Sequence, residues 1–322
     1  MRAALSSARV RTAVVRTILV IIKGGVLLAA LVASAAGCGT DGQAGPNANR
    51  LRVVATTMPV ADFARQVGGD RVEVTGILDA DAEPHQYEPS PSDAEAVAEA
   101  DLVVSNGAGL DDWLGDLLDQ AGAEAPRVEA TRGVRLLPTE EEGFPGDPHV
   151  WHDPKAAARM VDNIAAGLTR ADPRGAEAYR RRAEAYKRRL DGMAAEIRAG
   201  FASIPSGRRD LVTSHDAFGY FARAYDVKVV GSVLPAVTTE AEPSAQQIRA
   251  LINEIKAERA RTIFTEEALE PRLERRVAEE AGARVSTSLY ADALGGPRSG
   301  AAGFVEAELA NARAMRSAWA AP

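Results

Sequence analysis

The chain of 322 residues carries a net charge of −7 and a single cysteine. This acidic balance argues against a nucleic-acid-binding protein, because such proteins present a basic face. A lone cysteine has no partner for a disulfide within the chain, so the fold must be stabilised by its hydrophobic core. Once an N-terminal leader is set aside, the remaining length suits about two domains.

The N-terminal segment has the pattern of a signal peptide. Basic residues at positions 2, 9, 11, 16 and 23 precede the uncharged run "GGVLLAALVASAA", residues 24–36, which is too short to span a bilayer. Cys38 follows "SAAG", which resembles a bacterial lipobox except that Ala35 stands where leucine is usual. We expect a lipoprotein signal peptide over 1–37, an acylated Cys38 and a flexible polar tether over 38–50. The protein would then be extracytoplasmic and lipid-anchored to the cell membrane; an uncleaved membrane anchor is the alternative.

Strand and helix patterns alternate through the first half of the chain. Short apolar runs predict strands, and helical spacing or a capping box predicts helices. The predicted strands are Leu51–Thr57, Arg71–Leu78 and Asp101–Ser105; the predicted helices are Pro59–Val67, one opened by a capping box at Ser92–Glu95, Leu110–Leu118 and Pro154–Arg170. This alternation indicates a mainly parallel sheet covered by helices on both faces.

A long, highly charged helix is predicted over Ala176–Ala202, where apolar residues recur at helical spacing. Its length suits a rigid connection between two lobes. The α/β pattern then resumes, with strands over Leu211–Thr213, Val227–Val233, Thr262–Thr265 and Arg284–Ser286 and helices over Ala217–Tyr225, Ser244–Glu258, Pro271–Ala281 and Phe304–Ala318. We therefore expect an α/β protein with an N-terminal lobe over 51–172, a linking helix over 173–204 and a C-terminal lobe over 205–322.

The stretch "GDPHVWHDP", residues 146–154, contains two of the four histidines. Residues that precede proline favour extended backbone, so the segment is expected to be extended, with side chains that alternate in direction. His149 and His152 would then diverge, and only one of them would point into a given site. Asp153 is expected to cap a helix that begins at Pro154.

Three histidines lie where a predicted strand gives way to a helix: His85, His149 and His215. Ligands of open α/β sheets bind at the carboxyl ends of the strands, and imidazole is a common metal ligand. A closed tetrahedral site needs a fourth ligand. Asp292, in the glycine-bearing loop "SLYADALGG", is the best candidate for this fourth ligand. Glu266, at the end of "TIFTE", is the rival candidate. It could instead support a ligand from the second shell or cap the next helix.

Five segments resemble the zinc and manganese solute-binding lipoproteins of bacterial ABC transporters, cluster A-I. In chain order they are "EPHQYEPSPSD", "DPHVWHDP", "VTSHDAFGYFARAY", "GSVLPAVTTEAEPSA" and "LYADALGG". The resemblance implies two sandwich-like α/β lobes, a rigid linking helix and a metal in the interlobe cleft. It also implies four metal ligands, two from each lobe: His85 and His149, then His215 and Asp292. His152 is left as a second-shell or surface group.

The implied function is high-affinity capture of a divalent metal ion and its delivery to a membrane permease, by a protein expected to be a monomer. Three imidazoles and one carboxylate favour Zn²⁺, because imidazole suits zinc whereas Mn²⁺ prefers more oxygen ligands. Mn²⁺ is the alternative cargo. Many zinc-selective members carry a histidine-rich loop before the second ligand. Here that segment is "PTEEEGFPGD", without histidine. We expect it to be a solvated surface turn.

Two other classes of protein remain as alternatives. A zinc hydrolase could use three histidines as ligands, with Glu83 or Glu88 as the general base and an open coordination position for water. The sequence has no His-Glu-x-x-His motif, however, and a fourth ligand from Asp292 would leave no such position. An adhesin with a structural metal is the third class.

Overall fold

The computed structural model describes residues 50–79, 82–240 and 242–321. The predicted signal peptide, Cys38 and the tether up to residue 49 lie outside the described residues. The chain from Arg50 onward forms one compact unit. Within the described ranges, no helix combines the length and the apolar composition that crossing a bilayer requires.

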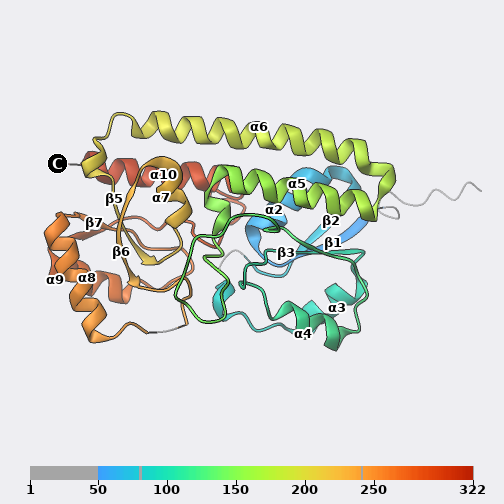
Figure 1. The fold of residues 1–322 in the computed structure, drawn as a ribbon, viewed down its shortest axis with the longest axis horizontal. Helices are drawn as coiled ribbons and strands as arrows, with labels where there is room; N and C mark the ends of the chain where they lie inside the picture. Colours follow the sequence, from blue (N-terminus) through green and yellow to red (C-terminus); the bar gives the residue numbers. More distant parts are fainter. Residues whose placement is uncertain (1–49, 80–81, 241, 322) are drawn as a thin grey trace, which may run out of the picture. The chain divides into compact units, whose positions relative to one another are not determined.

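The first half of this unit is built on a four-stranded parallel sheet with the order β2-β1-β3-β4. Alternate residues of β1 face opposite sides, so that Val53 packs with α2 and α5 while Val54 packs with α3 and α4. The sheet is therefore covered on both faces, as the alternating pattern predicted (Figure 1). The strands are β1 (Leu51–Ala55), β2 (Val72–Gly76), β3 (Leu102–Ser105) and β4 (Arg127–Glu129); the helices are α2 (Met58–Gly68), α3 (Pro91–Glu99), α4 (Leu114–Ala121) and α5 (Pro154–Ala171).

Local details of this half differ from the sequence-based expectation. The capping box is formed by Ser90 and Asp93, because Pro91 occupies the first turn of α3; the prediction at Ser92–Glu95 was two residues late. The short strand β4 was missed, since only Val128 of its three residues is apolar and buried. The segment from 147 to 153 is not extended, because Val150–His152 forms a 3₁₀ turn.

The second half repeats the parallel arrangement with two pairs of strands. β5 (Asp210–His215) pairs with β6 (Lys228–Leu234), and β7 (Thr262–Ile263) pairs with β8 (Arg284–Val285). The amide of Phe264 donates to the carbonyl of Val212 at 2.8 Å, which joins the two pairs. The helices of this half are α7 (Gly219–Tyr225), α8 (Ala245–Glu258), α9 (Arg272–Ala281) and α10 (Phe304–Ala320).

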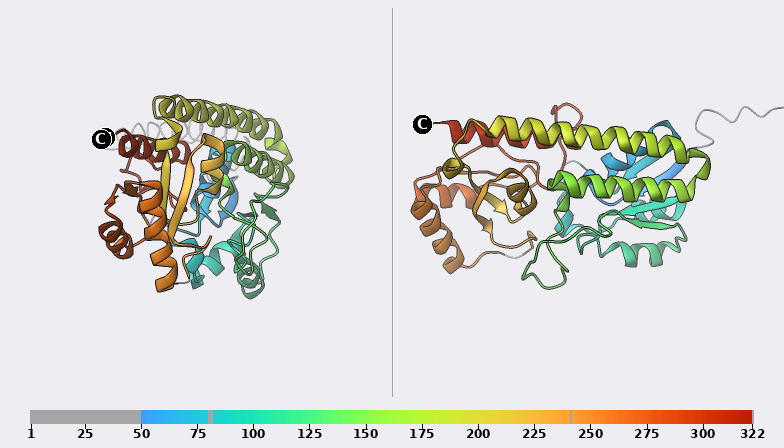
Figure 2. Two further views of the ribbon diagram at one scale, coloured as in Figure 1. Left: turned by 60° about the vertical axis from the view of Figure 1, so that its left-hand side comes forward. Right: turned by 45° about the horizontal axis from the view of Figure 1, so that its top comes forward.

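The long helix α6 (Ala176–Phe201) contacts helices from both halves of the chain. It packs against α2 and α5 of the first half and against α7 and α10 of the second (Figures 1 and 2). One apolar cluster runs from Val53 in β1 through Tyr186 and Phe201 of α6 to Trp319 at the end of α10. The division into two lobes at residues 172 and 205 stays a prediction; the observed core is continuous along α6.

A buried carboxylate joins three helices that are distant in sequence. Asp62 of α2 accepts hydrogen bonds from the Tyr186 hydroxyl at 2.8 Å and from the backbone amide of Phe304 at 3.2 Å. Tyr186 lies on α6, and Phe304 is the first residue of α10. The negative charge therefore also lies at the N-terminus of a helix, where the helix dipole favours it.

The substitution Asp62→Ala should lower the free energy of unfolding by about 2 to 4 kcal/mol, because it leaves a buried hydroxyl and a buried amide without an acceptor. Denaturant unfolding at equilibrium measures this change. Gln66→Ala is a suitable control, since it removes the peripheral bond to Asp62 and an exposed bond from Arg189 and should change stability by less than about 0.5 kcal/mol. Equal effects of the two variants would contradict a tie between helices at Asp62.

Candidate metal site

Four side chains from distant parts of the chain meet at the carboxyl ends of the parallel strands. His85 lies in the 3₁₀ turn that follows β2, and His149 directly precedes the turn leading into α5. His215 is the last residue of β5, and Asp292 lies in the loop between β8 and α10. The structure thus brings together all four residues of the predicted ligand set.

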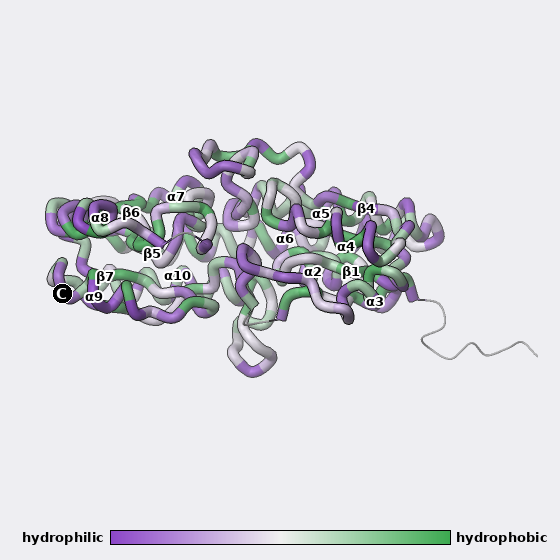
Figure 3. Tube along the Cα trace, turned by 90° about the horizontal axis from the view of Figure 1, so that it is seen from below, coloured by the Kyte–Doolittle hydropathy of each residue, from purple (hydrophilic) through white to green (hydrophobic). Residues whose placement is uncertain are grey.

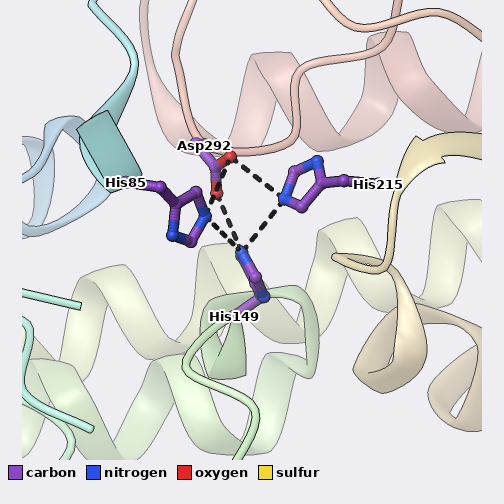
Figure 4. A group of neighbouring side chains, drawn as sticks. All are labelled: His85, His149, His215 and Asp292. Carbon is purple, nitrogen blue, oxygen red and sulfur yellow. Dashed lines mark hydrogen bonds and ion pairs between the residues drawn. The ribbon is translucent and has the colours of Figure 1, made fainter. Parts of the chain in front are cut away.

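The four groups face one point (Figure 4). Nε2 of His149 lies 3.3 Å from Nε2 of His85 and 3.3 Å from Nε2 of His215. The Asp292 carboxylate lies 3.2 Å from Nε2 of His149, 3.3 Å from that of His215 and 3.7 Å from that of His85. All four residues are buried. Three ring nitrogens and a carboxylate that converge out of contact with solvent can hold a divalent cation.

Outer carboxylates orient two of the three rings. Asp147 accepts hydrogen bonds from the amide of His149 at 2.9 Å and from its Nδ1 at 2.8 Å. Glu266 accepts from the amide of His215 at 2.9 Å and from its Nδ1 at 2.5 Å. Once its Nε2 proton is displaced, each ring keeps the proton on Nδ1 and presents an Nε2 lone pair to the shared point.

Glu266 therefore lies behind His215 and is not one of the four converging groups. It does not cap the next helix either, because α9 begins six residues later, at Arg272. Of the readings that the sequence left open, the contacts match the one in which Glu266 supports a ring.

His85 is held differently from the other two rings. Its Nδ1 has no hydrogen-bond partner among the described residues. Glu83 accepts from the backbone amide of His85 at 3.1 Å, which fixes the turn but not the ring. The site is thus asymmetric, because two rings have a carboxylate behind Nδ1 and the His85 ring has none among the described residues.

The loop that carries Asp292 is fixed by two side chains on other elements. Trp151 donates from its indole nitrogen to the carbonyl of Ala291 at 3.1 Å. The amide group of Asn311, on α10, donates to the carbonyl of Tyr290 and accepts from its amide, both at 2.8 Å. The backbone on the N-terminal side of Asp292 is therefore held by one residue from each half of the chain.

Burial and charge shift the pKa values of the four groups in different directions. Burial disfavours the charged form of His149, but the neighbouring Asp292 and Asp147 outweigh it and raise its pKa to about 10. Glu266 and Asp292 similarly outweigh burial at His215 and raise its pKa to about 9. Burial dominates at His85 and lowers its pKa to about 3. Asp292 is buried too, but the surrounding histidines hold its pKa well below the usual range.

His152 diverges from His149, although the extended backbone that led to this expectation is absent. Its Nδ1 lies 2.8 Å from the carboxylate of Glu308 on α10, and its ring stacks on Phe218. Both members of the pair are almost fully buried. His152 was expected to be a second-shell or a surface group, and its burial excludes the surface alternative. No hydrogen bond within the described residues links it to the four converging groups.

Sequence reasoning missed three supporting residues: Asp147, Trp151 and Asn311. Asp147 had a usable signal, because an aspartate two residues before a histidine can accept from the histidine's backbone amide in a local turn. Trp151 and Asn311 act through main-chain atoms of a remote loop, and nothing in their own neighbourhoods marks this role.

The arrangement gives little support to hydrolysis. A catalytic zinc keeps an open position for water, whereas the Asp292 carboxylate faces all three rings. Burial and the charge of Asp292 raise the pKa of Glu83 to about 7, but its carboxylate is bonded to the His85 amide. Glu88, the other candidate base, is exposed.

Replacement of Asn311 by alanine should loosen the Asp292 loop, because the Tyr290 amide and carbonyl both lose their partner. We expect a loss of about 1 to 3 kcal/mol in stability and faster hydrogen exchange at the Tyr290 amide. The neighbouring amide of Leu289 donates to Thr265 at 2.7 Å and serves as an internal control. Equal acceleration at both amides would indicate general destabilisation rather than a local tie.

Comparisons with family models and with known proteins point to the same family. The family model described as zinc-uptake complex component A, periplasmic, matches residues 53–318. The chain is 33% identical over 285 residues to the manganese-binding lipoprotein MntA of Bacillus subtilis, which covers 85% of this chain and 92% of that protein. It is 31% identical over 253 residues to the iron-binding protein YfeA of Yersinia pestis, with 78% and 80% covered.

Among solved structures, the periplasmic zinc-binding protein TroA from Treponema pallidum superposes with a TM-score of 0.79 at 28% identity. The match covers 84% of this chain and all of that one. The chain therefore belongs to the family of the zinc-uptake complex component A, the metal-binding solute receptors of ABC transporters, and serves metal uptake rather than catalysis.

Proposed function

We propose that His85, His149, His215 and Asp292 together hold one divalent metal ion, preferentially Zn²⁺, for delivery to a membrane permease. The observation that carries this proposal is the convergence of the three Nε2 atoms and the Asp292 carboxylate on one buried point.

The separations support four-coordinate zinc. Ligand bonds of about 2.0–2.1 Å in a tetrahedron place the donor atoms about 3.3–3.4 Å apart. The separations from Nε2 of His149 to those of His85 and His215, and from the three Nε2 atoms to the nearest Asp292 oxygens, are 3.2–3.7 Å. A zinc ion therefore fits between these donors with little movement of any side chain.

One observation favours manganese as a second candidate. Asp292 directs Oδ1 towards His149 and Oδ2 towards His85 and His215. A carboxylate placed in this way can bind through both oxygens, which would give a five-coordinate site with more oxygen character. Manganese prefers such ligands, and MntA of Bacillus subtilis is named for manganese binding.

The capture step requires the protein to remain near its permease. Acylation of Cys38 would provide this attachment, with residues 38–49 as the tether. The continuous core along α6 supports a capture mechanism with little relative movement of the two halves. Metal release would then depend on local rearrangement of the loops that carry the ligands. A monomer is sufficient for this mechanism, since one chain supplies all four groups.

Competitive loading tests the metal and the ligands together. Residues 39–322, stripped of metal and offered equal Zn²⁺ and Mn²⁺, should bind one zinc ion per chain in native mass spectrometry, because zinc ranks above manganese in intrinsic affinity. His149→Ala should abolish binding at concentrations that saturate the parent protein.

His152→Ala is the matched control for this experiment. It removes an equally buried imidazole three residues away that lies outside the converging group, so the variant should keep its metal. Preferential loading of manganese would reassign the cargo, and equal loss of metal in both histidine variants would contradict the ligand set.

Metal affinity should rise with pH, because a metal ion binds the neutral imidazole and displaces its proton. The raised pKa values of His149 and His215, about 10 and about 9, mean that both rings are protonated at neutral pH before the metal binds. His85, with a pKa of about 3, is already neutral. We expect the release of about two protons per metal ion near pH 7.5.

Calorimetry in two buffers of different ionisation enthalpy directly measures the number of protons released per metal ion. Binding that releases no proton at pH 7.5, or an affinity that falls as the pH rises from 6.5 to 8.5, would contradict the electrostatic description of the site.

A further inference from the structure

A second strongly charged feature lies away from the metal site, along the edge strand of the first sheet. β4 and α5 border a groove of about 690 Å³. Four arginines line it: Arg127, Arg132, Arg159 and Arg170. All four are exposed, and none forms an ion pair with a described residue. The chain as a whole is acidic, so the groove is a local departure from the general surface charge.

The frame of this groove is rigid. α5 packs so closely on β4 that a Cβ atom on Gly167 would lie 2.4 Å from the side chain of Val128. Asn163 donates to the carbonyls of Ala130 and Arg132 at 2.7 and 2.9 Å, which ties the turn after β4 to α5. The backbone that carries the four arginines is therefore held by two packed elements, which lie side by side in Figure 3.

One acidic residue, Glu129, also lines the groove, but it is engaged elsewhere. Thr131 donates to its carboxylate at 3.2 Å, and its side chain lies against Gly107. An alternative role for positive charge on an edge strand is to prevent pairing with strands of other chains. That role would not require the two arginines on α5, which are not part of the strand.

We propose that the β4–α5 groove binds the anionic phosphate headgroups of the membrane to which the protein is tethered. Guanidinium groups bind phosphate in a bidentate manner, which suits an arginine cluster better than one of lysines. This inference rests on the proposed anchor at Cys38, which would hold the folded unit close to the membrane surface, where anionic headgroups attract basic residues.

The length of the tether makes this contact geometrically feasible. The segment 38–49 has twelve residues and reaches at most about 40 Å when fully extended. It joins the compact unit at the start of β1. Arg127 pairs in register with Val103, which pairs with Val54, so Arg127 lies three residues along the sheet from Leu51 (about 10 Å) and two strands across it (about 10 Å). Headgroups at the anchor are thus within reach of the groove.

Vesicle binding tests the proposal with residues 39–322, which include the whole compact unit and lack Cys38. The protein should co-sediment with phosphatidylcholine vesicles only when they contain phosphatidylglycerol, and added salt should weaken this binding. A groove variant with glutamine at positions 127, 132, 159 and 170 should bind more than about a hundredfold more weakly, because each basic residue near an anionic surface contributes roughly fivefold.

The matched control removes the same charge elsewhere. Glutamine at Arg249, Arg272, Arg275 and Arg276, which are exposed on α8 and α9 and form no ion pair with described residues, should leave vesicle binding almost unchanged. Equal binding by the groove and control variants would overturn the proposal. Groove-dependent binding of inorganic phosphate without a preference for phosphatidylglycerol would assign the groove to a free anion instead.

Two further readouts separate this proposal from the others. The groove variant could lose metal uptake in cells and still bind vesicles. This result would indicate an acidic protein partner and overturn the lipid assignment. Metal loading of the same variants should be unchanged, since no groove residue belongs to the converging group. A failed vesicle assay would therefore leave the proposed metal capture intact.

Discussion

The structure depends on one electrostatic constraint, the burial of Asp292 among three imidazoles. A carboxylate out of contact with water is tolerated only when positive charge or hydrogen-bond donors surround it. The three rings come from segments that are 64 and 66 residues apart in sequence. Much of the fold is therefore organised to hold these segments in register: parallel strands end at a common edge, and α6 holds the two halves along a continuous core.

The carboxylates behind the rings convert this constraint into a defined site. Asp147 and Glu266 each hold both the amide and Nδ1 of a histidine, so ring orientation and tautomer are fixed together. The position of Asp292 is in turn fixed through main-chain atoms, by Trp151 from the first half and by α10 from the second. Each half thus contributes two converging groups, and the first half also holds the loop of Asp292 through Trp151.

The sequence was sufficient to predict the parallel α/β architecture and the long helix from local patterns. The same patterns gave histidine candidates and left Glu266 as a rival of Asp292, and the full set of four was implied by the resemblance to a known family. Strand-to-helix turns carry the histidines, and Asp153 followed by Pro154 marks the start of α5 as predicted. The 3₁₀ turn at Val150–His152 could not be read from its proline neighbours, because its geometry is set by the tertiary contacts of Trp151 and His152. The pairing of His152 with Glu308 was hidden for the same reason, since the partners are 156 residues apart.

The asymmetry of the site bears on how a bound ion could leave it. Moving His149 or His215 would break two hydrogen bonds to a buried carboxylate, whereas the His85 ring has no such partner. The neighbouring Gln86 donates from its side-chain amide to the carbonyl and the hydroxyl of Thr239, at 3.0 and 3.2 Å, and so joins this turn to the second half of the chain. Those two bonds lie at a partly exposed position, where water can replace them at low cost. Among the three histidines, His85 therefore has the fewest bonds to carboxylates to break, and we expect its turn to move first when the proposed metal ion leaves. A receptor with a rigid frame can then release its cargo without separating its two halves.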